Sequence, residues 1–197
     1  GATRGGRGVA LEADGQRVTA RPGETILKAA QRHGVEIPHL CYSDGLRPDG
    51  NCRACVVEIA GERTLAPSCC RAPTPGMKVQ AASPRARKSQ QMVVEMLLSD
   101  MPDMGYRWND EQKNTPELIA GSAYPESARG QFDSKTPEST GQHGELSEWA
   151  TRLGVAVRPA LKALRRQQPA PDLSHPAMAV NLDACIQCNR CVRACRE

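Results

Sequence analysis

Alternating apolar and polar positions near the start of the chain predict a small domain of strands and one helix. Two short alternating runs flank Asp14-Gly15, a pair that favours a tight hairpin turn. The helical pattern opens at Pro22-Gly23-Glu24-Thr25 and stops at Gly34, a typical helix C-cap. The predicted elements are a hairpin at 8–21, a helix at 22–34, a hairpin at 55–67 and a strand at 76–80. Together they predict an α+β fold over residues 8–82.

Beyond residue 82 the pattern becomes helical and then irregular. Ser83-Pro84 predicts a helix start, with serine as N-cap and proline at the first helical position. We expect this helix, residues 83–98, to pack on the first domain or on a partner through an apolar stripe of Met92, Val93, Met96 and Leu97. Residues 99–172 predict an irregular connector with short helices at 145–153 and 158–168.

The amino-acid composition limits the roles that the cysteines can have. The 197 residues include nine cysteines but only six aromatic side chains (one Phe, two Trp and three Tyr), so groups bound by the cysteines are expected to contribute to stability. Residues 1–8 lack a signal-peptide pattern, and no run approaches the ~18 apolar residues of a membrane span. We therefore expect a cytoplasmic protein without membrane contact, in which cysteines serve metal or redox sites rather than disulfides.

The net charge of +4 is too mild to indicate nucleic acid. No RNA-binding aromatic pattern is present. A basic helix face is predicted instead as a solvated or partner-facing surface; it consists of Arg158, Lys162, Arg165 and Arg166.

Four cysteines with the spacing C-x10-C-x2-C-x13-C suit a buried iron–sulfur cluster. They are Cys41, Cys52, Cys55 and Cys69. Cluster irons need thiolate ligands and backbone N–H donors, and Gly45, Gly50 and Ala54 keep the loop compact enough to supply them. The alternative of structural zinc is weaker, because such sites usually join two CxxC pairs and only one is present.

Several residues near these cysteines have competing interpretations. Cys70 competes with Cys69 as fourth ligand, but Cys69 keeps the thirteen-residue spacing, so we expect Cys70 to be a small buried residue. His39 is expected to be a hydrogen-bonding neighbour rather than a ligand, and His175 an ordinary loop residue. His33 and His143 are expected at the surface.

A second cysteine run, C-x2-C-x2-C-x3-C, is the spacing of ferredoxin-type 4Fe–4S ligation. Cys185, Cys188 and Cys191 are expected to bind one 4Fe–4S cluster, with Cys195 binding a second one that is completed downstream. Residues 173–197 would then begin a ferredoxin-type domain of a longer chain. A single cluster that uses Cys195 itself is the alternative.

The residues around the first set carry a resemblance to a known group of domains. The matching stretches are Ile37-Pro-His-Leu-Cys41, Asn51-Cys-Arg-Ala-Cys-Val-Val-Glu58, Pro67-Ser-Cys69 and Gly76-Met77. They are similar to the β-grasp, ferredoxin-like 2Fe–2S domain of the large iron–sulfur subunit of NADH:quinone oxidoreductase, of iron-only hydrogenases and of NAD-dependent formate dehydrogenases. The resemblance covers roughly residues 8–98 and implies an electron-transfer module with no catalytic residue of its own.

One missing motif favours the last of these relatives. In the first two, the helix leads into a His-x3-Cys-x2-Cys cluster site, whereas residues 97–104 here contain neither His nor Cys. Residues 97–103 and 174–185 resemble the α subunit of molybdenum-containing formate dehydrogenase. That resemblance implies molybdenum bis-pterin guanine dinucleotide, FMN and NAD in the whole enzyme, with flavin/NAD-binding and small iron–sulfur subunits as partners. An NAD-linked hydrogenase or NADH dehydrogenase subunit or adaptor is the alternative, and a zinc-binding interaction module is a remote one.

Overall fold

The structure, a computed structural model, describes residues 8–102, 144–167, 169–170, 172–175 and 178–196. The chain divides into two compact units, each described by itself. The first unit comprises residues 1–95, 149–156 and 188–197, and the second comprises 96–148 and 157–187. Most of the predicted connector at 99–172, together with His143, lies outside the described residues.

The first unit begins with the predicted hairpin, which is confirmed. Strands β1 (Val9–Ala13) and β2 (Gln16–Ala20) pair antiparallel, with Leu11 opposite Val18. Asp14 and Gly15 both adopt positive φ, of 48° and 81°, as a two-residue type I′ turn requires. Because side chains alternate across a strand, Leu11 and Val18 are buried on the same face of the sheet.

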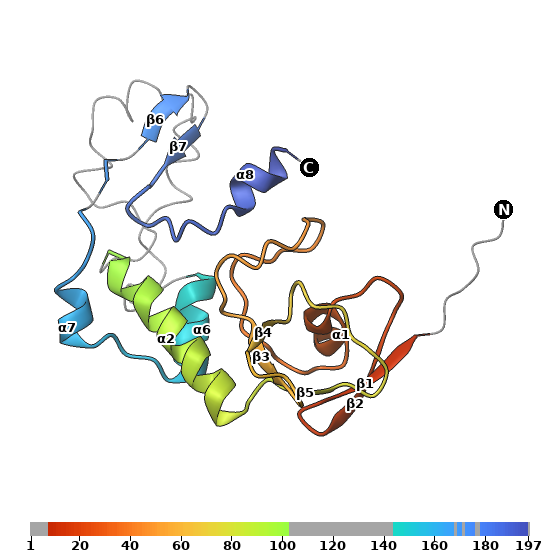
Figure 1. The fold of residues 1–197 in the computed structure, drawn as a ribbon. Helices are drawn as coiled ribbons and strands as arrows, with labels where there is room; N and C mark the ends of the chain where they lie inside the picture. The colour runs from red at the N-terminus through yellow and green to blue at the C-terminus, as the bar shows by residue number, and fades with distance from the viewer. Residues whose placement is uncertain (1–7, 103–143, 168, 171, 176–177, 197) are drawn as a thin grey trace, which may run out of the picture. The chain divides into compact units, whose positions relative to one another are not determined.

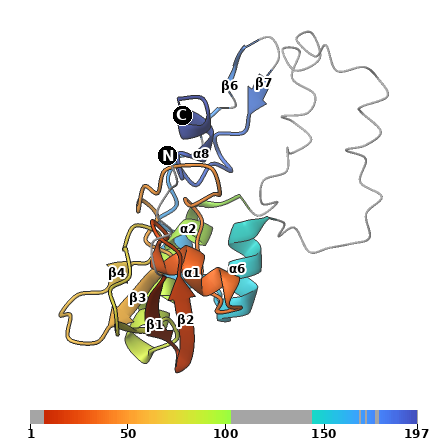
Figure 2. The same ribbon diagram turned by 90° about the vertical axis from the view of Figure 1, so that its right-hand side faces the viewer.

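Five strands form a mixed sheet around helix α1 (Ile26–Arg32) (Figures 1 and 2). The order is β2-β1-β5-β3-β4, where β3 is Val56–Ile59, β4 is Ala66–Pro67 and β5 is Lys78–Gln80. Strands β1 and β5 run parallel, and the remaining pairs are antiparallel. This mixed sheet with a helix is consistent with the predicted ferredoxin-like domain.

The core between the sheet and α1 is built from small aliphatic side chains. Thr25 caps α1, its hydroxyl accepting a hydrogen bond from the Lys28 amide, and the helix ends before Gly34 at φ 75°. The helix buries Ile26, Leu27, Ala29 and Ala30 against Val18, Val57, Ile59 and Val79 of the strands. The near absence of aromatic residues therefore does not prevent a continuous core.

Helix α2 (Pro84–Asp100) starts where predicted but docks through a different face. The Ser83 hydroxyl accepts from the Ala86 amide as an N-cap. Met92 and Met96 of the predicted stripe are 49% and 61% exposed, whereas Ala86, Gln90 and Val94 are buried. The Gln90 amide decides the docking, since Nε2 donates to the carbonyls of Val56 at 2.9 Å and Ala81 at 3.0 Å. Met92 and Met96 therefore do not pack on the first domain, while Val93 and Leu97 are half-buried, and packing of this stripe on a partner stays a prediction.

Later elements are short. Helix α6 (Glu145–Leu153) has the predicted bounds, whereas the helix predicted over 158–168 is only the single turn of α7 (Pro159–Lys162). Strands β6 (Asp172–His175) and β7 (Met178–Val180) form a hairpin that the sequence did not predict, and α8 spans Arg190–Ala194. Among the described residues, no helix is both long and apolar enough to cross a membrane.

Candidate iron–sulfur centre

The first cysteine set lies on the irregular segment between α1 and β3 and on the turn after β4. Arg53, between Cys52 and Cys55, has φ 59°, a left-handed conformation that is uncommon for a non-glycine residue. The amide of the next residue, Ala54, hydrogen-bonds to Cys52. Left-handed turns of this kind direct backbone N–H groups into an anion-binding concavity, which many iron–sulfur sites use.

The backbone amides of Cys41 and Cys52 each donate a hydrogen bond to the sulfur of the other residue. The Cys41 amide donates to Cys52 Sγ at 3.4 Å, and the Cys52 amide donates to Cys41 Sγ at 3.5 Å. The Asn51 amide also hydrogen-bonds to Cys41, and the Cys69 amide to Cys55. The loop therefore presents several backbone donors to sulfur, which is typical of a cluster-binding segment.

The turn that carries Cys69 is held by the start of α1. The Leu27 amide donates to the Ser68 carbonyl at 3.0 Å, and the Ile26 amide donates to the Arg71 carbonyl at 2.9 Å. Ser68 is fully buried, and its hydroxyl donates to the Cys55 carbonyl at 2.7 Å. Ser68 thus joins the two segments that carry Cys55 and Cys69, a role that no sequence signal indicated.

All four predicted ligands lie together. Hydrogen bonds link their thiols in the order Cys52, Cys41, Cys69, Cys55. Cys41, Cys55 and Cys69 are at most 1% exposed, and Cys52 is half-buried at the outer end of this row. We call these four residues the thiol row.

Cys70 differs from the expectation of a buried residue, because it is exposed. The amides of Cys70 and Arg71 both donate to the Pro67 carbonyl, at 3.0 and 3.1 Å, forming a tight turn. Cys69 is buried within the thiol row, whereas the adjacent Cys70 is exposed and contacts the row at Cys69. The two sulfurs are 3.6 Å apart.

The contacts within the thiol row separate the pKa values of its members. Hydrogen bonds from Cys52 and Cys69 lower the pKa of Cys41 to about 2, and a hydrogen bond from Cys69 lowers that of Cys55 to about 7. The same contacts raise the pKa of Cys52 and Cys69, because each acts as a donor to a neighbouring thiolate. Thiolate is the form that binds iron, so the surroundings favour the reactive state of Cys41 and Cys55.

His39 lies two residues before Cys41 in the sequence. Its Nδ1 donates to the Ile37 carbonyl at 2.9 Å, and its Nε2 lies 3.3 Å from the Gln31 side-chain nitrogen. The ring also packs on Trp149 of α6, with centroids 5.8 Å apart. Both ring nitrogens are thus directed to groups other than the cysteines.

The second cysteine run is divided between the two units. Cys185 belongs to the second unit, whereas Cys188, Cys191 and Cys195 belong to the first. Cys191 and Cys195 are exposed, and Cys185 and Cys188 are half-buried. The predicted roles of these four residues in 4Fe–4S binding therefore stay predictions.

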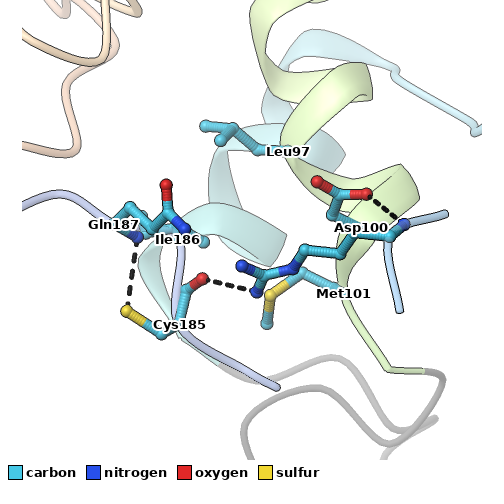
Figure 3. Close-up of a pocket in the computed structure, with 7 residues that line it drawn as sticks. Leu97, Asp100, Met101, Cys185, Ile186 and Gln187 are labelled. Carbon is cyan, nitrogen blue, oxygen red and sulfur yellow. Dashed lines mark hydrogen bonds between the residues drawn. The ribbon is translucent and has the colours of Figure 1, made fainter. Parts of the chain in front are cut away.

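A small cavity of about 180 Å³ adjoins Cys185 within the second unit (Figure 3). The Arg166 guanidinium donates to the Cys185 carbonyl at 2.9 Å, and the Gln187 amide donates to Cys185 Sγ at 3.3 Å. The Asp100 carboxylate accepts from the Arg166 amide at 3.3 Å. These three hydrogen bonds order the segment that leads into the terminal run.

Arg165 and Arg166 contradict the expectation of a solvated or partner-facing basic surface. Arg165 donates two hydrogen bonds to the Asp183 carboxylate, at 3.0 and 3.1 Å, and Asp183 is only 4% exposed. Both arginines are half-buried. They serve internal contacts because their long side chains reach the segment that precedes Cys185.

The thiol row fits an iron–sulfur cluster by its donor chemistry. Within the part of the chain that the structure describes, no three or more His, Cys, Asp and Glu side chains surround a position for a single metal ion. A 2Fe–2S cluster instead takes four cysteine thiolates shared between two irons. The thiol row offers four thiols, backbone N–H donors and burial, which is the donor set that such a cluster requires.

Comparison with known proteins agrees with this interpretation. Residues 6–84 match the family model described as the 2Fe-2S iron-sulfur cluster binding domain. A component of NADH-quinone oxidoreductase from Rhizobium meliloti (strain 1021) is 29% identical over 185 residues, covering 93% of this chain but 18% of that protein. The mitochondrial NADH-ubiquinone oxidoreductase 78 kDa subunit of Candida albicans is 29% identical over 185 residues, covering 94% of this chain and 22% of that protein. The chain thus spans about a fifth of the length of these relatives.

A solved structure of a related type is also similar to this chain. The crystal structure of an NAD+-reducing [NiFe]-hydrogenase in the H2-reduced state matches with a TM-score of 0.65 at 25% identity, covering 94% of this chain and 65% of that one. The match of residues 6–84 to this family model supports the predicted 2Fe–2S domain, and the chain is similar to parts of these oxidoreductases. The formate dehydrogenase assignment stays a prediction.

Proposed function

We propose that Cys41, Cys52, Cys55 and Cys69 bind a 2Fe–2S cluster through which this chain relays electrons inside a larger NAD-linked oxidoreductase. One observation carries the proposal: the thiols form a continuous, mostly buried row to which backbone amides donate. Neither a disulfide pair nor a mononuclear site accounts for four thiols in one row with amides directed at them.

Each part of the site has a role that follows from its geometry. The amides of Cys41, Cys52 and Ala54 donate to sulfur and so stabilise negative charge on the ligands. The buried thiols of Cys55 and Cys69 exclude water from the inner end of the row, while half-buried Cys52 leaves the other end nearer to solvent. When bound, the cluster supplies reversible one-electron transfer, so the protein needs no proton donor.

For the terminal run we propose that Cys185, Cys188 and Cys191 bind a 4Fe–4S cluster and that Cys195 ligates a further one. The support is the C-x2-C-x2-C-x3-C spacing. The Gln187 amide that donates to Cys185 Sγ is a contact of the kind that supports thiolate ligands.

For the parent enzyme we propose an NAD-dependent formate dehydrogenase in which formate oxidation takes place outside these 197 residues. The support is the sequence at the end of α2 and directly after it, because residues 97–104 lack the His and Cys of an intervening cluster site. Electrons would pass between a molybdenum site and an NAD-reducing flavin subunit.

A second candidate is an NAD-linked hydrogenase or NADH dehydrogenase. Its support is the match to components of NADH-quinone and NADH-ubiquinone oxidoreductases and to an NAD+-reducing hydrogenase over most of this chain. Both candidates use the thiol row in the same way and differ in the electron donor.

The experiment is to isolate the native complex that contains this chain without oxygen and offer it formate, hydrogen or NADH. Reduction of NAD+ by formate, together with molybdenum in the complex, supports the first candidate. Reduction by hydrogen but not formate, or quinone reduction by NADH, would replace it with the second. Zinc in place of iron and acid-labile sulfide would refute both.

A further inference from the structure

Arg193 is the one buried arginine on α8, within the terminal cysteine run of the described chain. It is 6% exposed, although its helix neighbours Cys191, Val192, Ala194 and Cys195 are all exposed. A guanidinium is charged and is rarely buried without partners. Because this helix has only five residues, the buried guanidinium must find its hydrogen-bond acceptors elsewhere in the first unit.

The partners are backbone carbonyls of the first cysteine loop. Arg193 Nη2 donates to the Cys41 carbonyl, and Nη1 donates to the Arg47 carbonyl. Both acceptors belong to the segment between Cys41 and Cys52, 152 and 146 residues away in sequence. The fork of one guanidinium thus joins the two cysteine motifs of the chain, and a lysine could not span both acceptors in the same way.

The hydrogen-bond partners of the Arg193 guanidinium include no carboxylate that would neutralise its charge. Both partners are neutral carbonyls, and Arg193 Nε is buried with no hydrogen-bond partner among the residues that the structure describes. A full positive charge is therefore fixed in a poorly solvated place beside the residue that is the first ligand of the thiol row. A nearby positive charge stabilises added negative charge more strongly where water is excluded.

We propose that Arg193 is a positioning residue that clamps α8 to the Cys41 loop and raises the reduction potential of the 2Fe–2S cluster held by the thiol row. The proposal rests on the proposed cluster. Reduction adds one negative charge to the site, and the fixed guanidinium lowers the free energy of that state relative to the oxidised one. The same contact makes folding of the terminal run and of the first loop depend on each other.

The test compares three variants in the full chain carrying its clusters. Arg193→Gln removes the charge but keeps a donor, Arg193→Lys keeps the charge but loses the fork, and Arg196→Gln removes an exposed charge just beyond the end of the same helix. The readouts are a dithionite redox titration followed by the EPR signal of the reduced 2Fe–2S cluster, and amide hydrogen exchange across residues 41–52. Neither readout requires enzymatic activity.

We expect Arg193→Gln to lower the equilibrium constant for one-electron reduction about tenfold, which corresponds to about 59 mV toward more negative potential. Arg193→Lys should shift the constant less than about threefold, and Arg196→Gln should leave it unchanged. Exchange in residues 41–52 should accelerate in both Arg193 variants, because each loses at least one carbonyl contact, but not in Arg196→Gln.

A wild-type potential in Arg193→Gln with the cluster intact would overturn the inference. If Arg193→Gln does not assemble a cluster, Arg193→Lys decides: a potential near wild type supports the inference, and a tenfold shift or failure to assemble overturns the proposed role of charge. The absence of any 2Fe–2S signal from the wild-type chain would instead refute the proposed function itself.

Discussion

Gln90 offers the sharpest test of how the first unit is held together. It is 1% exposed, and its side-chain nitrogen donates to the carbonyls of Val56 in β3 and Ala81 after β5. The change Gln90→Met keeps the length of the side chain but removes both donors. Two buried carbonyls then lose their hydrogen bonds, while the packing volume stays nearly constant.

The structure sets the expected magnitude. A buried polar group without its partner costs about 1–3 kcal/mol. Because a carbonyl oxygen can accept a second bond and the site can relax, two such losses should total about 2–4 kcal/mol. That is a large part of the roughly 5–15 kcal/mol that stabilises an ordinary domain.

Equilibrium urea unfolding followed by circular dichroism measures the change. With a slope of about 1–2 kcal/mol per molar for a domain of this size, the midpoint should fall by roughly 1–4 M. Lys88→Met, at an exposed position on the same helix, is the matched control and should lie within about 0.5 kcal/mol of wild type. If Gln90→Met also lies within that margin, Gln90 does not fix the docking of α2 and the account of this helix is wrong.

Three further outcomes follow from other contacts. Gly50→Ala should destabilise the first unit by about 1–2 kcal/mol, because φ is 64° there and the new Cβ would lie 2.9 Å from the Cys70 sulfur; an unchanged urea midpoint contradicts this. Hydrogen bonds from Arg32 are the chief cause that lowers the pKa of Glu24 from 4.5 in the folded protein. The contribution of this carboxylate to the free energy of unfolding is therefore fully present above pH 4.5 and is lost as the pH falls through the lower folded-state pKa. The difference in unfolding free energy between wild type and Glu24→Gln should therefore shrink toward acid pH, and a difference independent of pH would count against the pair. Asp183→Asn should destabilise the second unit by about 1–3 kcal/mol, because the largely buried charge of Arg165 then lacks the carboxylate that it binds. Amide hydrogen exchange in residues 157–187 should accelerate, and an unaltered exchange rate would contradict this prediction.

Local signals predicted the first domain well. The Asp14-Gly15 turn, the Thr25 cap and the Gly34 terminus each depend on backbone conformations that a few neighbouring residues determine. The grouping of the four cysteines also followed from spacing and loop chemistry, because a cluster-binding segment must bring its thiols together.

Features that depend on distant partners were not predictable in this way. The docking face of α2 is set by carbonyls that Gln90 meets only in the folded chain, so the apolar stripe did not indicate that Gln90 would be buried while Met92 and Met96 stay exposed. The helix expected at 158–168 ends early, and Arg165 and Arg166 bind Asp183 and backbone carbonyls. These contacts join segments that are far apart in sequence, and periodicity contains no information about them.

The position of Cys70 shows the same limit at close range. Cys69 and Cys70 are adjacent and chemically identical, yet the structure buries Cys69 and leaves Cys70 exposed, with a turn at the Pro67 carbonyl between β4 and these residues. The spacing argument selected Cys69, but it could not tell that Cys70 is exposed.

Replacing Cys69 and Cys70 by serine, one at a time, tests whether the thiol row binds a 2Fe–2S cluster. Cys69→Ser and Cys70→Ser change the same atom at adjacent positions, and the EPR spectrum of the dithionite-reduced protein, with iron and acid-labile sulfide analysis, reports the cluster. We expect Cys69→Ser to lose or strongly alter the 2Fe–2S signal, whereas Cys70→Ser should retain the wild-type spectrum and iron content. A wild-type spectrum in Cys69→Ser, or loss of the signal in Cys70→Ser alone, would contradict this expectation.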